Sequence, residues 1–123
     1  MDTALAGRAV LIAEDEFLVA FHWESVLEDQ GARVSAVASV AEGLEIADQG
    51  FDGAVLDVSL LDGDVFPVAD RLQKNGTPFV FHSGHALLDD LAARYPRSEA
   101  VAKPASEGML IGALTRVMAC RDG

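Results

Sequence analysis

The sequence has one cysteine, few basic residues and few aromatic residues. Cys120 is the only cysteine, which excludes an intrachain disulfide and a cysteine-based zinc site and fits a reducing cytoplasm. The 9 lysine and arginine residues stand against 20 aspartate and glutamate residues, so the net charge is −11. Because nucleic acids and anionic membranes attract basic surfaces, we expect neither as a partner.

Long hydrophobic runs are absent too. No uncharged apolar stretch approaches the roughly 20 residues that a membrane-spanning helix needs, and Met1-Asp2-Thr3 lacks the basic start of a secretory signal. Half of the residues are nevertheless hydrophobic, which argues against disorder. A chain of 123 residues matches the usual size of one hydrophobic core, so we expect a single soluble, cytoplasmic domain over residues 1–123.

Helix-stopping glycines divide the chain into alternating helices and strands. Gly31, Gly50 and Gly76 are each followed within a few residues by an extended apolar stretch. The predicted strands cover residues 8–13, 33–37, 54–58, 79–82 and 100–102. Their starts are about 20 to 25 residues apart, a spacing that fits parallel βα units and not hairpins.

The segments between the strands have a helical pattern. Helices are predicted at 17–30, at 39–49, from the Asp62-Gly63 turn to Asn75, at 87–95 and at 106–120. Ser39-Val40-Ala41-Glu42 fits a capping box, in which the Ser39 oxygen accepts from a backbone N–H and Glu42 reaches back to the Ser39 amide. Consecutive apolar residues in the strands imply that both sheet faces are buried. The fold class is therefore α/β, a doubly wound parallel sheet in three layers.

Ligands of such sheets collect at the carboxyl ends of the strands. The residues at these ends are Glu14, Asp15, Asp57, Ser83, Gly84 and Lys103. Carboxylates brought within several Å repel one another, so the cluster needs a positive neighbour. Mg²⁺ prefers oxygen ligands and leaves positions open for phosphate oxygens. Lys103 can pair with a carboxylate at rest and with an added phosphoryl group afterwards.

Taken together, these motifs resemble bacterial response-regulator receiver domains over essentially the whole chain. The matching segments are Glu14-Asp15 after Val10-Leu11-Ile12, Ala54-Val55-Leu56-Asp57, Leu61-Asp62-Gly63, Ser83-Gly84 after Phe79-Val80-Phe81, and Lys103-Pro104. The resemblance implies the strand order 2-1-3-4-5 and a cis bond before Pro104. It also implies that Asp57 is the phosphoacceptor and that Ser83 and Lys103 contact the phosphoryl oxygens. The implied magnesium ligands are Glu14, Asp15, Asp57 and the main-chain carbonyl of Ser59.

The implied function is phosphoryl acceptance in a two-component system. A histidine kinase or a histidine phosphotransfer protein is the expected donor, whose phosphohistidine loses its phosphoryl group to an Asp57 oxygen by in-line attack. The chain would be no enzyme beyond assisting its own Mg²⁺-dependent phosphorylation and dephosphorylation. No output domain follows the last helix, so we expect any signal to pass through contacts with a downstream protein target. The resemblance is to regulators of the stand-alone type, and the sequence does not decide between a stand-alone protein and a piece of a larger chain. Homodimer formation stays open.

The pattern departs from the family at Ala100, where receivers commonly have an aromatic residue three positions before the lysine. Residues 78–84 loosely resemble a subgroup of single-domain regulators with a Phe-Ala-Thr-Gly signature and no such aromatic residue, although His82 replaces the alanine. We therefore expect phosphorylation to reorder the segment from His85 to Tyr95 instead.

Family positions that tune dephosphorylation lie two residues beyond the phosphoacceptor and two beyond the switch hydroxyl. In this chain they are Ser59 and His85, and the small Gly84 should leave the phosphate reachable.

Two other functions need residues that this chain does not have. Phosphatases of the haloacid dehalogenase type need an acid two residues after the nucleophile, where this chain has Ser59. A flavodoxin-like cofactor carrier needs a phosphate-cradling loop after the first strand, where Glu14-Asp15-Glu16 would repel phosphate. The remaining alternative is a receiver-like interaction module that is not phosphorylated. Ala100 keeps it open, and the acidic set with Lys103 opposes it.

The remaining polar and aromatic motifs favour ordinary structural roles. His82 and His85 straddle a strand end and a glycine, which does not favour a histidine metal site. His22 is expected on a helix surface or in packing, and Trp23 and the phenylalanines are expected in the core. Asp62-Gly63-Asp64 lacks the later glutamate of a calcium loop and is expected to form a turn.

Overall fold

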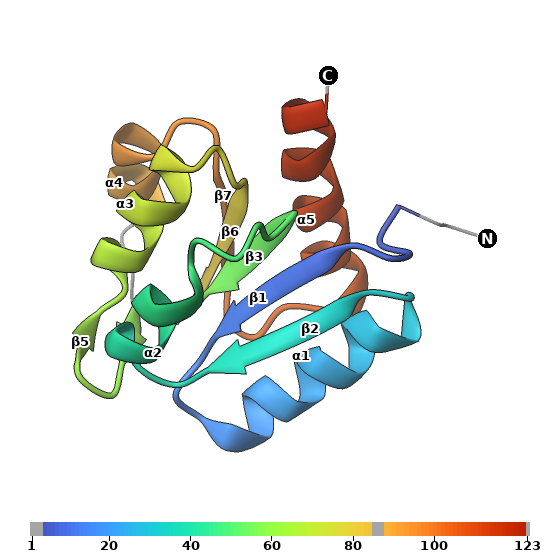
Figure 1. Ribbon diagram of the computed structural model, residues 1–123, viewed down its shortest axis with the longest axis horizontal. Helices are drawn as coiled ribbons and strands as arrows, with labels where there is room; N and C mark the ends of the chain where they lie inside the picture. The colour runs from blue at the N-terminus through green and yellow to red at the C-terminus, as the bar shows by residue number, and fades with distance from the viewer. Residues whose placement is uncertain (1–3, 85–87, 123) are drawn as a thin grey trace.

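The computed structural model describes residues 4–84 and 88–122 and has a five-stranded parallel sheet at its centre (Figure 1). The strands of this sheet are β1 (Ala9–Ala13), β2 (Arg33–Val37), β3 (Gly53–Leu56), β6 (Phe79–Ser83) and β7 (Glu99–Ala102). They lie in the order β2-β1-β3-β6-β7. Numbered along the chain, these five strands have the order 2-1-3-4-5, so the predicted fold class and topology are confirmed.

Helices cover both faces of the sheet. On one face lie α1 (Phe17–Asp29) and α5 (Glu107–Asp122), and on the other α2 (Val40–Ile46), α3 (Phe66–Lys74) and α4 (Leu88–Arg94) (Figure 1). Each layer has its own apolar cluster. Consecutive residues of β6 divide between them, because Val80 packs with α1 and α5 whereas Phe79 and Phe81 pack on the other side. Both faces of the sheet are therefore buried, as its apolar strands predict.

The helix patterns found in the sequence correspond to buried faces. Trp23 is buried in the core, as expected. The prediction that the phenylalanines lie in the core is wrong for Phe17 and Phe21, which are exposed on the outer side of α1. Helix α5 buries an apolar stripe as well, which consists of Leu110, Ala113, Leu114, Val117 and Met118. Helix α2 is shorter than predicted and ends at Ile46. The predicted start of the fourth helix at residue 87 lies outside the described residues.

The capping box at the start of α2 is present in altered form. The Glu42 amide donates to the Ser39 hydroxyl at 3.1 Å, as predicted. The Glu42 carboxylate accepts from the Ala38 amide at 3.0 Å, where the sequence pattern predicts the Ser39 amide. The Glu42 carboxylate therefore accepts from the amide one residue before the predicted one.

A short hairpin that the sequence analysis did not predict follows Asp57. The third strand ends at Leu56 instead of Val58, and β4 (Ser59–Leu60) pairs antiparallel with β5 (Gly63–Asp64). The predicted turn at Asp62-Gly63 lies at the tip of this hairpin, where β5 begins. The Asp62 carboxylate accepts from the amides of Val40 at 2.6 Å and Ala41 at 3.1 Å, so it caps α2 from a distant part of the chain.

Two further features concern the backbone and membrane insertion. The peptide bond between Lys103 and Pro104 is cis, as the family resemblance implies. Within residues 4–84 and 88–122, no helix combines the length and the apolar character that crossing a membrane requires.

Candidate functional site

The strand register brings the predicted site residues to one edge of the sheet. Ala13 pairs with Leu56, so Glu14 and Asp57 leave β1 and β3 at the same level. Ser83 pairs with Ala102, so Lys103 leaves β7 level with the end of β6. Backbone hydrogen bonds continue past the strand ends, since the Asp57 amide donates to the Ala13 carbonyl at 2.8 Å. The site is therefore held by the sheet itself and not by a long loop.

The Lys103 ammonium joins two buried carboxylates. Its Nζ lies 2.7 Å from Glu14 Oε1 and 3.0 Å from Asp57 Oδ2. The second oxygen of Glu14 accepts from the Glu16 amide at 3.1 Å. The second oxygen of Asp57 accepts from the Ser59 amide at 3.4 Å. Glu14 and Asp57 are only 4% and 9% exposed, so each depends on these donors in place of water.

Burial and charge act against one another in this cluster. Burial raises the pKa of Glu14 to about 7, although the hydrogen bond from Lys103 works in the other direction. For Lys103, burial disfavours the charge, but the hydrogen bonds to Glu14 and Asp57 outweigh it and raise the pKa of the ammonium. The lysine thus stays charged while it neutralises the pocket.

Asp15 completes an acidic group that suits a hard metal ion. One carboxylate oxygen each from Glu14, Asp15 and Asp57 lie within 4.8 Å of one another. Mg²⁺ takes oxygen ligands at about 2.0–2.1 Å and usually keeps several waters, so a group of three carboxylates with one half-buried member fits it. We call Glu14, Asp15, Asp57 and Lys103 the acidic pocket.

The other predicted site residues surround this pocket. Ser83 is buried at the end of β6, and its carbonyl accepts from the Lys103 amide at 3.1 Å. Gly84 is exposed, and a side chain there would come within 3.8 Å of the Lys103 Cβ atom. Ser59 is exposed at the start of β4. His85 lies outside the described residues.

Ala100 lies in β7 beside Phe81, and its methyl group packs against the cluster of α2, α3 and α4. The aromatic side chain that receivers commonly have at this position of β7 is therefore replaced by a methyl group.

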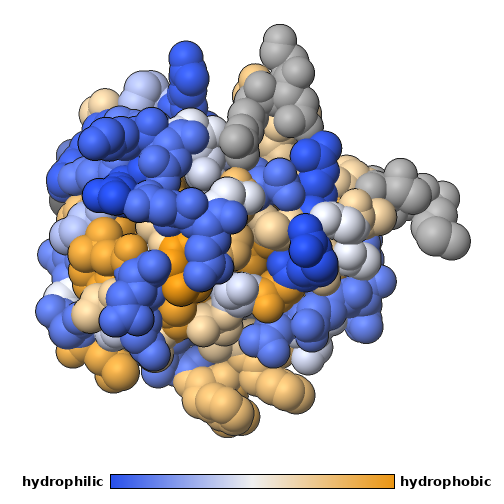
Figure 2. Space-filling model, viewed as in Figure 1, coloured by the Kyte–Doolittle hydropathy of each residue, from blue (hydrophilic) through white to orange (hydrophobic). Residues whose placement is uncertain are grey.

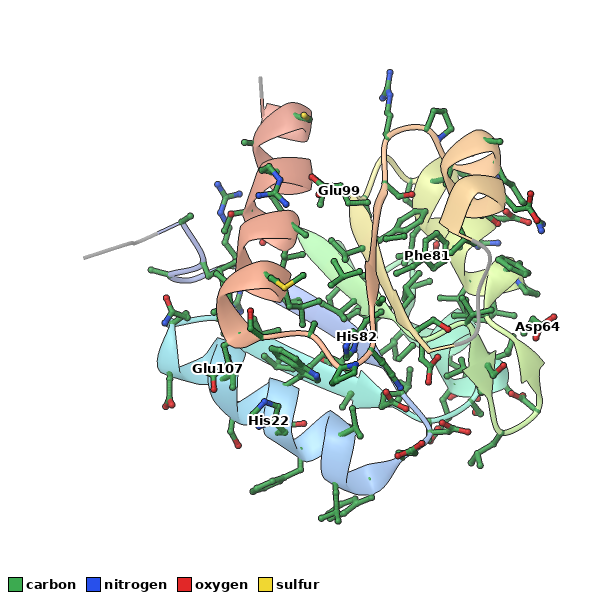
Figure 3. All side chains as sticks on the ribbon, turned by 180° about the vertical axis from the view of Figure 1, so that it is seen from behind. His22, Asp64, Phe81, His82, Glu99 and Glu107 are labelled. Atoms are coloured by element: carbon green, nitrogen blue, oxygen red, sulfur yellow. The ribbon has the colours of Figure 1, made fainter. Side chains whose placement is uncertain are left out.

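The sequence analysis missed the surroundings of His82. This residue is buried next to Ser83, its ring meets Trp23 edge-on, and its Nε2 atom has no hydrogen-bond partner (Figure 3). A polar residue directly after the apolar run Phe79-Val80-Phe81, in the same strand, was the available signal, because a strand that is buried on both faces leaves this side chain no route to water.

A groove of about 1030 Å³ lies elsewhere, lined by residues that include Thr77, Pro96, Glu99 and Arg116. Arg116 and Glu99 already pair through two hydrogen bonds of 2.9 Å. Because this groove contains none of the predicted site residues, the chemistry points to the acidic pocket instead.

The fold and the pocket can be compared with known proteins. A scan against protein-family models and a search of curated proteins each found no match. Among solved structures, the chain is similar to a response regulator receiver protein from Sinorhizobium medicae, with 32% identity and a TM-score of 0.85 over 94% of this chain and 97% of that chain. It is also similar to SdrG from Sphingomonas melonis, with 31% identity and a TM-score of 0.73 over 96% and 99% of the two chains.

A more distant match is the receiver domain of a sensor histidine kinase from Pseudomonas aeruginosa, which has a magnesium ion coordinated in its active site cleft. It is 22% identical, with a TM-score of 0.80 over 93% of this chain and 99% of that chain. At this identity the match supports the fold.

Proposed function

This chain belongs to the response regulator receiver domains, and from that membership we propose that it accepts a phosphoryl group on Asp57 in two-component signalling. The observation that carries the proposal is the Lys103 ammonium, which lies between the buried carboxylates of Glu14 and Asp57 with Asp15 beside them. A fixed positive charge next to a buried carboxylate suits a reaction in which negative charge arrives on that carboxylate. We propose that residues 1–123 act as one such domain.

The chemical step is a transfer from nitrogen to oxygen. An Asp57 carboxylate oxygen attacks the phosphorus of a phosphohistidine in line, the P–N bond breaks, and the imidazole leaves with the electron pair and gains a proton. Lys103 then exchanges its contact with the Asp57 carboxylate for one with a phosphoryl oxygen, and the Ser83 hydroxyl donates to another. Positioning and countercharge supply most of the catalysis, because the transferring group is loosely bonded.

The metal site would be formed by Glu14, Asp15, Asp57 and the main-chain carbonyl of Ser59. When bound, Mg²⁺ would offset the charge of the carboxylates and of the phosphoryl oxygens. The Ser59 amide already contacts Asp57, which supports a position for this residue at the edge of the pocket.

Neighbouring side chains would set the lifetime of the aspartyl phosphate. Ser59 is exposed beside Asp57 and, with His85, would tune hydrolysis, while Gly84 leaves the phosphate reachable from solvent. Ala100 supports a switch that does not use an aromatic ring in β7.

The partners follow from this chemistry. The donor is a histidine kinase or a histidine phosphotransfer protein, and a downstream protein reads the phosphorylated state. The chain has no enzymatic activity in this proposal beyond assisting its own phosphorylation and dephosphorylation.

The test is incubation with a small phosphodonor and Mg²⁺, followed by intact-mass measurement. Wild type is expected to gain one phosphoryl group, and Asp57→Asn none, because the amide is not a nucleophile. Asp64→Asn is the matched control, since Asp64 is an exposed acid in the nearby hairpin. Chelation of Mg²⁺ is expected to suppress the adduct.

A phosphoryl adduct on Asp57→Asn would show that the nucleophile is a residue other than Asp57. No adduct on wild type, even with a competent histidine kinase, would favour the interaction module that works without phosphorylation.

A further inference from the structure

The imidazole of His82 is buried on the sheet face that α1 and α5 cover. His82 is 4% exposed and is the penultimate residue of β6. Side chains alternate along a strand, and Val80 packs with α1 and α5 whereas Phe81 does not, so His82 points toward these helices. Its ring meets the edge of Trp23, with 5.4 Å between ring centres and an interplanar angle of 83°. Figure 3 shows His82 here, with His22 farther out on α1.

No hydrogen bond holds this ring through its Nε2 atom. Among the described residues, Nε2 of His82 is the one buried side-chain nitrogen or oxygen without a hydrogen-bond partner. Burial lowers the pKa of His82 to about 4, with a further contribution from the Lys103 charge, so the ring is neutral near pH 7. The ring therefore keeps its position through packing against Trp23, and no polar contact of Nε2 resists its movement.

The end of β6 is also connected to the acidic pocket. Ser83 follows His82 directly, and its carbonyl accepts from the Lys103 amide at 3.1 Å. The charges of Lys103 and Asp57 both act on the His82 ring. Because protein interiors are close-packed, a displacement of Ser83 toward a phosphoryl group would move the neighbouring ring against Trp23.

On the other face of β6, Phe81 packs in an aromatic cluster with Phe79 and Tyr95. There Ala100 lies beside Phe81, and a methyl group cannot change position as an aromatic ring can. Tyr95 packs on the same cluster, but its hydroxyl is tied to Asp70 at 2.6 Å. Within residues 4–84 and 88–122, the buried aromatic contact beside the pocket that lacks such a tether is therefore the one between His82 and Trp23.

We propose that His82 and Trp23 transmit a change in the occupancy of the acidic pocket to helix α1, an inference that rests on the phosphoacceptor function proposed above. The first two turns of α1 expose three large apolar side chains, Phe17, Leu18 and Phe21. Figure 2 shows an apolar projection over this start of the helix. A shift of α1 thus changes the apolar surface beside the pocket, where a partner can detect it.

Trp23 is the only tryptophan of the chain, so its fluorescence reports on this contact directly. The experiment adds Mg²⁺ and beryllofluoride, a phosphoryl mimic, to the full chain and follows the emission. Intact-mass measurement with a small phosphodonor is made on the same preparations. Wild type is expected to change its emission, whereas His82→Leu is expected to keep the phosphoryl adduct and lose most of the emission change.

His22→Leu is the matched control. The His22 ring also meets Trp23 edge-on, with 4.8 Å between ring centres, but it is exposed and does not lie between Trp23 and the pocket. This variant is expected to keep the emission change of wild type.

Hydrogen exchange of wild type tests the same inference without a substitution, so it remains decisive if His82→Leu does not fold. The mimic is expected to change exchange in α1, residues 17–29. Three outcomes would overturn the coupling: unchanged emission together with unchanged exchange in α1, an exchange change confined to residues 88–95, or a wild-type emission change in His82→Leu. In each case the phosphoryl adduct would still support the proposed function. A wild type that takes up neither phosphoryl group nor mimic would overturn both.

Discussion

In the part of the chain that the structure describes, the two faces of the sheet have apolar clusters of equal size but hold their aromatic side chains differently. Among the described residues, each apolar cluster contains 15 buried members. On the α2–α4 face, Phe79, Phe81 and Tyr95 pack together with ring centres 5.3 to 5.5 Å apart. On the α1–α5 face, the buried aromatic contact consists of Trp23 and His82. The difference between the faces therefore lies in the anchoring of the rings and not in the size of the core.

The α2–α4 cluster is anchored by polar contacts at its edge. The Tyr95 hydroxyl donates to Asp70 Oδ1 at 2.6 Å, and the Arg94 guanidinium lies 4.4 Å from the centre of the Phe66 ring. Nothing comparable holds Nε2 of His82. A ring with a polar anchor resists displacement, whereas one held by packing alone can follow the strand that carries it. The comparison thus favours the α1–α5 face for the proposed response, in place of the segment from His85 to Tyr95 that the sequence predicts.

The largest expected effect tests whether the apolar clusters on the two faces of the sheet are equally well packed. Leu72→Ala in α3 and Leu114→Ala in α5 both remove a fully buried side chain, and each is expected to lower the free energy of unfolding by about 2–5 kcal/mol. Urea unfolding measures both. If Leu114→Ala lowered the free energy of unfolding far less than Leu72→Ala, the whole layer of α1 and α5 would be loosely packed. The weak anchoring of His82 would then be a property of that layer and not of this one residue.

The next effect concerns pH. Because the pKa of His82 is about 4 in the fold and 6.5 for an ordinary histidine, the unfolded chain binds a proton at this residue between these values and the folded chain does not. Wild type therefore loses stability at this site as the pH falls through 6.5, and the loss reaches about 3 kcal/mol near pH 4. His82→Leu lacks this loss.

Urea unfolding of wild type and His82→Leu at several pH values measures the difference. At pH 7 the variant is expected to lose no stability, because removing an unpaired buried polar atom is neutral or favourable. As the pH falls toward 4, the variant is expected to become more stable relative to wild type. A difference that does not change with pH would mean that the ring is protonated equally in both states, and the neutral, unanchored ring would be the wrong description.

Local patterns were sufficient for the sheet and for most of the pocket. Apolar runs and glycine stops placed all five main strands, and parallel pairing then brings Glu14, Asp57 and Lys103 to one edge. The carboxyl end of a parallel strand is fixed in space once its neighbours are known, so residues there can be predicted without side-chain detail.

The features that were missed depend on contacts between distant parts of the chain. Strands of two residues, such as β4 and β5, are too short to have a periodicity. The capping of α2 by Asp62 and the contact of His82 with Trp23 each join residues from separate elements. Whether a buried histidine finds a hydrogen-bond partner is decided by packing, which sequence patterns do not describe.

The smallest effect tests the anchor on the α2–α4 face. Tyr95→Phe keeps the ring and removes the hydroxyl that donates to Asp70, so it is expected to lower the free energy of unfolding by about 1 kcal/mol. Asp70→Asn and the double variant complete a cycle that separates this contact from the Arg94 side chain, which lies 3.6 Å from the same carboxylate. If Tyr95→Phe had no effect in urea unfolding, the ring would be held by packing alone, as His82 is. The two faces would then be equally able to respond, and the assignment to α1 would depend on the fluorescence of Trp23 and on hydrogen exchange in α1.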